Sequence, residues 1–183
     1  MTKKEQRHRL SLIIATLGPS TDDPKELDTM IIAGIARQWT DGIDIARVVF
    51  NDGHLAVINR VDAFRKQSEK RKAETFIYLD IDDLDDSNFS EYLKMADEIS
   101  PKYIAIPKKF GLERIKETKK KIDNIIQVGV RVKADDNLDD LDIFLEQSDF
   151  AMMESDSKSI VDNKIVKKAK EKNCEPIYLA KMP

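Results

Sequence analysis

The sequence predicts an α/β protein whose strands run parallel. Along its 183 residues, seven short runs rich in apolar and β-branched residues alternate with helical patterns. Strict strand–helix alternation implies right-handed crossovers and therefore a parallel sheet. Two architectures fit this order, a doubly wound open sheet and a (β/α)8 barrel without its last strand. The glycine-rich motifs of the usual nucleotide-binding open sheets do not occur in the sequence. Because the sequence holds no repeat and no low-complexity linker, we expect one domain over residues 1–183.

The first three strand–helix pairs are predicted from their apolar patterns and from the residues at their ends. Strands are expected over residues 10–17, 43–50 and 75–80, and helices over residues 24–39, 55–71 and 87–99. Asp22 or Asp23 can cap the first helix, since aspartate is a favoured N-cap residue. Pro24 then suits the first turn of the helix. In the second helix an apolar residue recurs every three positions from Leu55 to Phe64, which is typical of a helix with one buried face.

The second half of the chain repeats the same alternation. Strands are expected over residues 102–106, 125–132, 149–153 and 176–180, and helices over residues 112–122, 138–145 and 159–172. The helix over residues 138–145 is expected to be capped near Asp136 or Asn137. Cys174 lies at the junction before the last strand, and we assign it no catalytic role.

Composition and charge narrow the classes of function. Hydrophobic residues make up 41% and charged residues 36% of the chain, as in a soluble globular protein. A net charge of −3 gives no general attraction to nucleic acid or to an anionic membrane. No apolar run approaches the roughly 18 residues that span a bilayer. A single cysteine excludes an internal disulfide and suits a reducing compartment, so we expect a cytoplasmic protein.

The strand and turn over residues 43–54 are the most informative part of the sequence. Arg47 interrupts a run of buried-type residues, and a buried arginine rarely lacks an anionic partner. Asn51, Asp52 and Gly53 follow at the carboxyl end of the strand, where the ligand sites of α/β folds gather. Two interpretations are open: a ligand site, or an Asp-Gly turn with Arg47 in a structural ion pair.

Five segments in the same order resemble the catalytic barrel of pyruvate kinase. They are residues 13–20, 41–53, 78–80, 137–149 and 175–180, which together extend over nearly the whole chain. The segment 41–53, Asp-Gly-Ile-Asp-Ile-Ala-Arg-Val-Val-Phe-Asn-Asp-Gly, is similar to the family's Ala-Gly-Met-Asp-Val-Ala-Arg-Leu-Asn-Phe-Ser-His-Gly. The resemblance selects the barrel over the open sheet. The expected fold is therefore a parallel (β/α) TIM-barrel-like α/β fold, incomplete with about seven strands.

The resemblance implies a set of candidate site residues. The family transfers a phosphoryl group from phosphoenolpyruvate to ADP with Mg²⁺ and K⁺. Arg47 matches its phosphate-contacting arginine, Asp80 matches a monovalent-cation ligand, and Arg131 stands in place of its catalytic lysine. The resemblance thus gives a catalytic position at Arg131, anion-binding positions at Arg47, Lys133 and Lys181, and metal-binding positions at Asp80, Asn51 and Asp156.

Several positions depart from the family pattern in ways that change the chemistry. Val49 replaces an asparagine ligand and Lys133 replaces a metal-binding glutamate, and an ammonium group cannot ligate Mg²⁺. Asp52 stands where the family has a histidine, and Lys181 where it has a substrate-contacting threonine. Residues 82–88 take the place of the family's lid domain, and the last βα unit and the C-terminal domain have no counterpart.

The function expected from these features is a pyruvate-kinase-like domain without catalytic activity. It would be retained as a binding, regulatory or assembly module with a phosphate or carboxylate site. Mg²⁺ and K⁺ are expected as cofactors only because the family that the sequence resembles uses them. One alternative is an active phosphotransferase, and another is a different barrel enzyme acting on small anionic substrates. A third is a purely structural network, in which the cations pair with Asp80, Asp135 and Asp156.

A sheet of seven strands leaves its two outer strands unpaired on one side, and unpaired edges favour association. We therefore expect a homo-oligomer or an obligate protein partner that closes the open barrel. A small anionic ligand is the other expected partner, and neither nucleic acid nor a membrane is expected.

Overall fold

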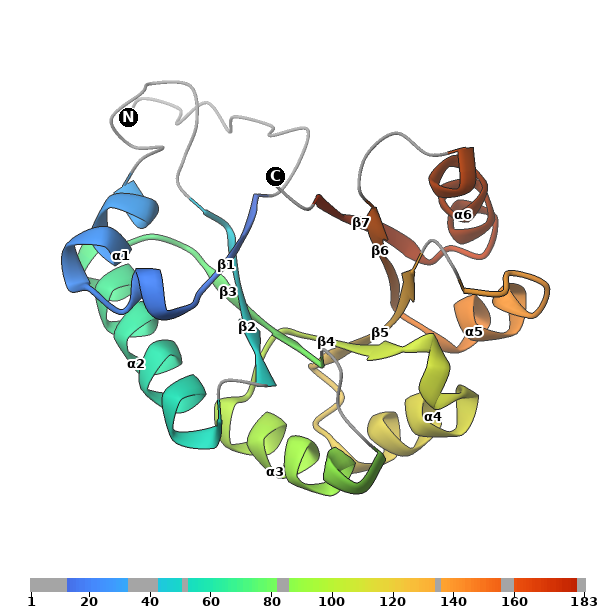
Figure 1. The fold of residues 1–183 in the computed structure, drawn as a ribbon, viewed down its shortest axis with the longest axis horizontal. Helices are drawn as coiled ribbons and strands as arrows, with labels where there is room; N and C mark the ends of the chain where they lie inside the picture. The colour runs from blue at the N-terminus through green and yellow to red at the C-terminus, as the bar shows by residue number, and fades with distance from the viewer. Residues whose placement is uncertain are drawn as a thin grey trace, which may run out of the picture.

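The chain forms a seven-stranded parallel sheet that curls into an open half-barrel (Figure 1). The computed structural model describes residues 13–32, 43–50, 53–81, 86–133, 136–155 and 160–180. The strands lie side by side in the order of the sequence, and every neighbouring pair is parallel. They are β1 (Ile14–Thr16), β2 (Ile45–Val49), β3 (Phe76–Asp80), β4 (Tyr103–Pro107), β5 (Gln127–Lys133), β6 (Phe150–Ser155) and β7 (Glu175–Ala180). The predicted α/β fold with alternating parallel strands and helices is confirmed.

The helices between the strands lie on the outer side of the curl (Figure 1). They are α1 (Pro24–Ile32), α2 (His54–Arg71), α3 (Phe89–Ile99), α4 (Leu112–Lys121), α5 (Leu141–Gln147) and α6 (Ile160–Glu171), with the 3-10 turns η1 (Pro19–Thr21), η3 (Asp86–Asn88) and η4 (Lys108–Phe110). The predicted continuation of the first helix through Trp39 lies outside the described residues. Within the described residues, no helix is both long enough and apolar enough to cross a membrane.

The start of α1 decides between its two predicted caps, whereas the start of α5 contradicts both Asp136 and Asn137, because Asp140 is the residue before the helix. Asp23, rather than Asp22, precedes α1, and its Oδ1 accepts a hydrogen bond of 2.7 Å from the backbone N–H of Lys25. The fifth helix begins at Leu141 and so starts later than predicted. Asn137 instead accepts a hydrogen bond from the backbone N–H two residues on, which forms a local turn before the helix.

Alternating side chains of the strands build two separate apolar layers. The outer layer fills the space between the sheet and the helices, and Leu79, Ile104 and Val130 are fully buried in it. The inner layer lies within the curl. Its buried members are Ile45, Tyr78, Ala105, Phe150 and Met152. Because side chains alternate along a strand, residues two positions apart share one face, which places Asp80 on the same inner face as Tyr78.

A glycine in β5 allows an aromatic ring to pack against the inner face of the sheet. A Cβ atom added at Gly129 would lie 2.5 Å from two ring carbons of Phe150. That ring is held from other sides by edge-on contacts with Tyr103, at 5.7 Å between centroids, and with Tyr78, at 6.5 Å. The Phe150 ring therefore has little space into which it could move if residue 129 carried a side chain.

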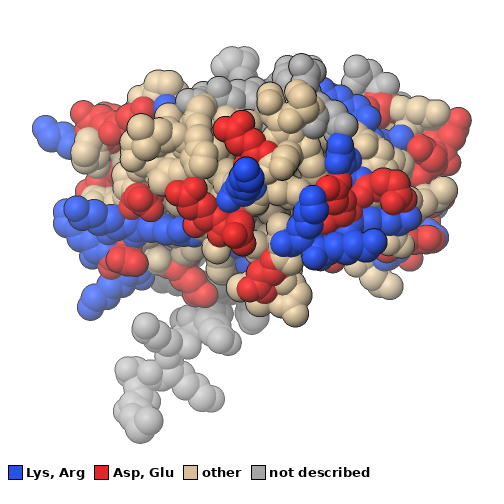
Figure 2. Space-filling model, turned by 90° about the horizontal axis from the view of Figure 1, so that it is seen from below, with Lys and Arg blue, Asp and Glu red and all other residues tan. Residues whose placement is uncertain are grey.

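The outer surface carries interspersed acidic and basic side chains. Figure 2 shows the face formed by α3 and its neighbouring helices, where blue and red side chains lie next to one another without a large patch of one sign. Such a surface fits the small net charge of −3.

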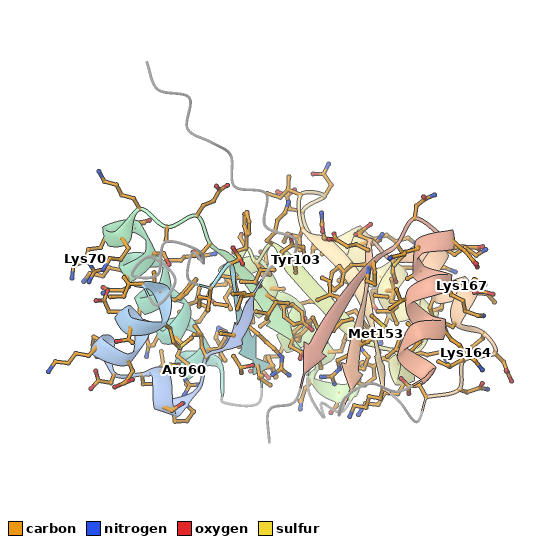
Figure 3. All side chains as sticks on the ribbon, turned by 90° about the horizontal axis from the view of Figure 1, so that it is seen from above. Arg60, Lys70, Tyr103, Met153, Lys164 and Lys167 are labelled. Carbon is orange, nitrogen blue, oxygen red and sulfur yellow. The ribbon has the colours of Figure 1, made fainter. Side chains whose placement is uncertain are left out.

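The half-barrel has two open edges, β1 and β7. Figure 3 looks into the opening between them, and shows Lys164 and Lys167 pointing away from the sheet on α6. The backbone N–H of Glu175 donates to the carbonyl of Asp149, so alternate residues of β7 face β6. Pro176 falls on the other side, where its missing N–H costs the ladder no hydrogen bond, as is typical of an edge strand.

Replacing Gly129 by alanine should destabilise the fold by about 1–3 kcal/mol, because the new methyl group forces the Phe150 ring out of its place. The free energy of unfolding is measured by urea titration. Gly18→Ala is the matched control, because its backbone is extended and a Cβ there meets nothing within 4 Å. Its effect should stay within about 0.5 kcal/mol. Equal effects of the two substitutions would contradict the proposed packing.

Candidate functional site

Three charged side chains meet on the inner face of the half-barrel. Arg47 comes from β2, Asp80 is the last residue of β3, and Arg131 comes from β5. They are 8%, 0% and 1% exposed, so all three are withdrawn from water. Their inward orientation follows from the strand register, in which Arg47 pairs with Tyr78 and Arg131 pairs with Met152.

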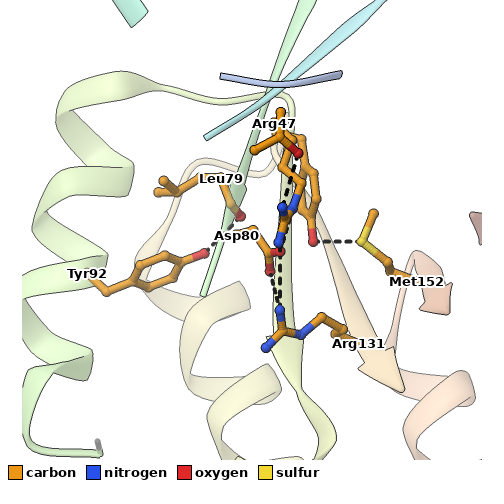
Figure 4. Close-up of polar contacts among 8 residues, drawn as sticks. Arg47, Leu79, Asp80, Tyr92, Arg131 and Met152 are labelled. Atoms are coloured by element: carbon orange, nitrogen blue, oxygen red, sulfur yellow. Dashed lines mark hydrogen bonds and ion pairs between the residues drawn. The ribbon is translucent and has the colours of Figure 1, made fainter. Parts of the chain in front are cut away.

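The Asp80 carboxylate accepts hydrogen bonds from both guanidinium groups (Figure 4). The Nε of Arg47 lies 2.7 Å and its Nη2 lies 2.5 Å from Oδ2 of Asp80. The Nη1 of Arg131 lies 3.3 Å from Oδ1 and 3.2 Å from Oδ2. This cluster, which we call the Arg–Asp–Arg cluster, bridges β2, β3 and β5 across the inner face.

Two buried tyrosines border the cluster and stay neutral. The hydroxyl of Tyr78 donates to the sulfur of Met152 at 2.8 Å, and that of Tyr92 donates to the carbonyl of Leu79 at 3.2 Å (Figure 4). Burial, followed by the negative charge of Asp80, raises the pKa of each phenol well above 10.0. Both hydroxyl groups are therefore donors, not anions, at neutral pH.

Lys133 extends the positive charge toward the carboxyl end of β5. It lies two residues beyond Arg131 and thus on the same inner face, and it is half-buried. Its backbone N–H donates to Oδ2 of Asp136 at 2.7 Å. Within the described ranges no carboxylate lies in ion-pair distance of its ammonium group. Among the described residues, no acidic group therefore neutralises this ammonium group.

The structure brings part of the predicted site together. Arg47, Asp80 and Arg131 form one hydrogen-bonded cluster, and Lys133 continues it along β5. Three other predicted site residues, Asn51, Asp156 and Lys181, lie outside the described residues, as do Asp52 and Asp135 of the wider interpretation.

Thr16 joins the cluster, although no sequence motif predicted that it would. The Nη1 of Arg47 donates to Oγ1 of Thr16 at 3.1 Å. Thr16 faces inward because its Cα pairs with that of Arg47 in the parallel register of β1 and β2. The register of β1 and β2 would have identified Thr16, but a single sequence does not reveal that register.

The donor set favours anions over metal cations. Both oxygens of Asp80 already accept hydrogen bonds from guanidinium groups. In the part of the chain that the structure describes, no group of three His, Cys, Asp or Glu side chains could hold a metal ion. Guanidinium and ammonium groups instead suit phosphate or carboxylate oxygens. The Mg²⁺ and K⁺ sites implied by the resemblance stay predictions.

Cys174 lies away from this chemistry. It is buried in the outer apolar layer, and burial raises the pKa of its thiol to about 11. The thiol is therefore protonated at neutral pH and is a poor nucleophile.

Comparison with models of known protein families finds no match, and comparison with curated proteins finds none either. Fold and geometry define the chain as an α/β protein of seven parallel strands, curled into an open half-barrel with a buried Arg–Asp–Arg cluster inside.

Replacing Asp80 by asparagine should destabilise the fold by about 3–5 kcal/mol, because it leaves two buried guanidinium groups without their shared carboxylate. Chemical denaturation measures the loss. Asp22→Asn is the control, since Asp22 also pairs with an arginine, Arg60, but is half exposed. The control should cost less than about 1 kcal/mol. A similar loss in both variants would show that the cluster does not stabilise the fold as argued.

Proposed function

We propose that this chain is a pyruvate-kinase-like domain without catalytic activity that binds a small phosphate or carboxylate anion inside the half-barrel. The observation that carries the proposal is the inward-facing, half-buried ammonium group of Lys133, which no described carboxylate neutralises. It stands near the carboxyl ends of the strands, where ligands of parallel α/β folds bind. Arg47 adds a further positive charge on the same inner face, where its guanidinium pairs with Asp80.

The same residues argue against retained phosphoryl transfer. In the pattern of the family that the sequence resembles, Lys133 occupies the place of a carboxylate that binds Mg²⁺, and Val49 the place of an asparagine ligand. Neither side chain offers an oxygen to a metal ion. Phosphoryl transfer needs such cations to neutralise the charge that moves. Only residues 81–88 stand between β3 and α3, too few for a closing lid domain.

An active phosphotransferase of pyruvate-kinase type is the alternative function. A coupled assay for pyruvate formed from phosphoenolpyruvate and ADP, with Mg²⁺ and K⁺ present, distinguishes the two. We expect no turnover above the buffer blank, and clear turnover would replace the proposal by this alternative.

Phosphate and phosphoenolpyruvate should raise the unfolding temperature without any added metal. At a ligand concentration ten times Kd, binding adds about 1.4 kcal/mol to the free energy of unfolding. Lys133→Gln should weaken phosphate binding about tenfold, because one charge-assisted contact is lost. Differential scanning fluorimetry and calorimetric titration measure both effects.

Lys167→Gln is the control for this experiment, because it removes the same charge from the exposed outer side of α6 (Figure 3). It should bind phosphate like the unaltered protein. Equal affinities of the Lys133 and Lys167 variants, or stabilisation that needs Mg²⁺, would count against the proposed anion site.

We also propose self-association through the edge of β7 as the assembly role of this domain. The outward side of β7 carries the backbone groups of Pro176, Tyr178 and Ala180. In a dimer with its twofold axis at Tyr178, the β7 strands of the two copies could pair antiparallel. The only hydrogen bonds missing from this pairing are those that the N–H of residue 176 would donate, because Pro176 has no N–H. The edge of β1 is shorter, because this strand has three residues.

Sedimentation equilibrium at micromolar concentration should therefore show a dimer. Tyr178→Pro removes the central outward N–H and leaves the bonds to β6 in place, so it should shift the protein to monomer. Ile177→Pro is the contrasting variant, because it removes an N–H that faces β6 and should lower stability as well. A monomer at every concentration would contradict this proposal and leave the anion site unaffected.

A further inference from the structure

A cavity lies at the amino ends of β3 and β4, at the end of the half-barrel opposite to the Arg–Asp–Arg cluster. Its volume is about 260 Å³. The polar and rim side chains that line it are Arg65, Thr75, Phe76, Ser100, Lys102 and Ile125. Phe76 is the first residue of β3, whereas Asp80 of the Arg–Asp–Arg cluster is the last. The two sites therefore share no residue.

The charge of this cavity is positive. Arg65 and Lys102 contribute two cations, Thr75 and Ser100 contribute hydroxyl groups, and no acidic side chain lines the cavity. An anion that enters it would meet two positive charges and two hydrogen-bond donors.

The arginine is held in place but retains donors. Nη2 of Arg65 donates to the carbonyl oxygens of Ile99, at 2.5 Å, and Ser100, at 3.3 Å, where α3 ends. Its Nε and Nη1 make no hydrogen bond to any residue that the structure describes. The guanidinium is thus oriented by the helix end, and that reduces the entropy lost when a ligand binds.

Many described cations on this surface pair with a carboxylate, as in Arg60–Asp22, Arg71–Asp28, Lys108–Asp140, Lys119–Asp149, Lys168–Asp142 and Lys172–Glu146. The ammonium group of Lys102 has no such partner among the described residues. Arg65 and Lys102 therefore bring two cations to one cavity without a described carboxylate to neutralise them.

The apolar lining limits the class of ligand. Phe76 is half-buried and packs edge-on against Tyr103, with 6.4 Å between ring centroids. Ile125 is 67% exposed at the rim, an unusually large apolar exposure for this chain. A purely hydrophilic ion such as phosphate would leave these surfaces wet, whereas an apolar body on the ligand would cover them.

We propose that this cavity binds a small amphipathic monocarboxylate, with its carboxylate between Arg65 and Lys102 and its apolar body against Phe76 and Ile125. The volume admits a ligand of the size of benzoate. This site does not depend on the anion site near Lys133, and either can exist without the other.

The test is a titration of the full chain with benzoate, followed by backbone amide NMR shifts and by calorimetry. Benzamide is the matched uncharged ligand. Benzoate should bind at least about tenfold more tightly than benzamide and shift the amides of Thr75, Lys102 and Ile125. Lys102→Gln should reduce benzoate affinity about tenfold and leave benzamide affinity unchanged.

Two controls separate this site from general charge effects and from the other site. Lys70→Gln removes an exposed charge on the same helix as Arg65, and Lys133→Gln alters the carboxyl-end site. In both variants, benzoate should shift the amides of Thr75, Lys102 and Ile125 as it does in the unaltered chain. Urea unfolding verifies that each variant is folded. If Arg65→Gln fails to fold because it frees the end of α3, Lys102→Gln decides the question.

Equal binding of benzoate and benzamide, full benzoate affinity in the Lys102 variant, or amide shifts near Lys133 instead of Lys102 would each overturn the proposal. Absence of any shift up to millimolar benzoate would overturn it as well. None of these results bears on phosphate binding near Lys133, which has its own test.

Discussion

The sharing of one buried carboxylate by two guanidinium groups is the constraint on which the inner face of this half-barrel depends. A single charge there would cost several kcal/mol, and Asp80 offsets that cost for Arg47 and Arg131 together. The cluster joins three strands from opposite sides of the curl and so fixes their relative positions. Below it, toward the amino ends, the inner face is aromatic and apolar. The Arg–Asp–Arg cluster and Lys133 therefore lie at the carboxyl end of the inner face.

The curl also separates two ends with different chemistry. The carboxyl end combines the Arg–Asp–Arg cluster with Lys133, a set that suits small hydrophilic anions. The amino end combines two cations with aromatic and aliphatic surface, which suits an anion with an apolar body. What the two places share is a convergence of cations from different elements, with Lys133 and Lys102 each lacking a described carboxylate partner. The edge of β7, through which we propose self-association, is a third surface of interest.

The proposed lack of catalysis is compatible with a stable fold, because the two depend on different residues. Fold stability comes from the outer apolar layer and the strand ladders, which tolerate changes at the carboxyl ends of the strands. Phosphoryl transfer instead needs oxygen ligands for its metal ions, and the lysine at position 133 offers none. A chain can therefore resemble pyruvate kinase in its strands and differ from it in chemistry.

The sequence by itself determined the alternation of strands and helices, the places of all seven strands and the ionic character of Arg47. These follow from local apolar periodicity and from the cost of burying an unpaired charge. Helix starts were less predictable, because Asn137 served a turn instead of the cap of α5. Only the tertiary structure decided that Arg131 and Thr16 meet Arg47 around one site, and that Arg65 and Lys102 line a common cavity. These contacts join residues far apart in the chain, and their distances depend on strand register and curvature, which local sequence does not encode.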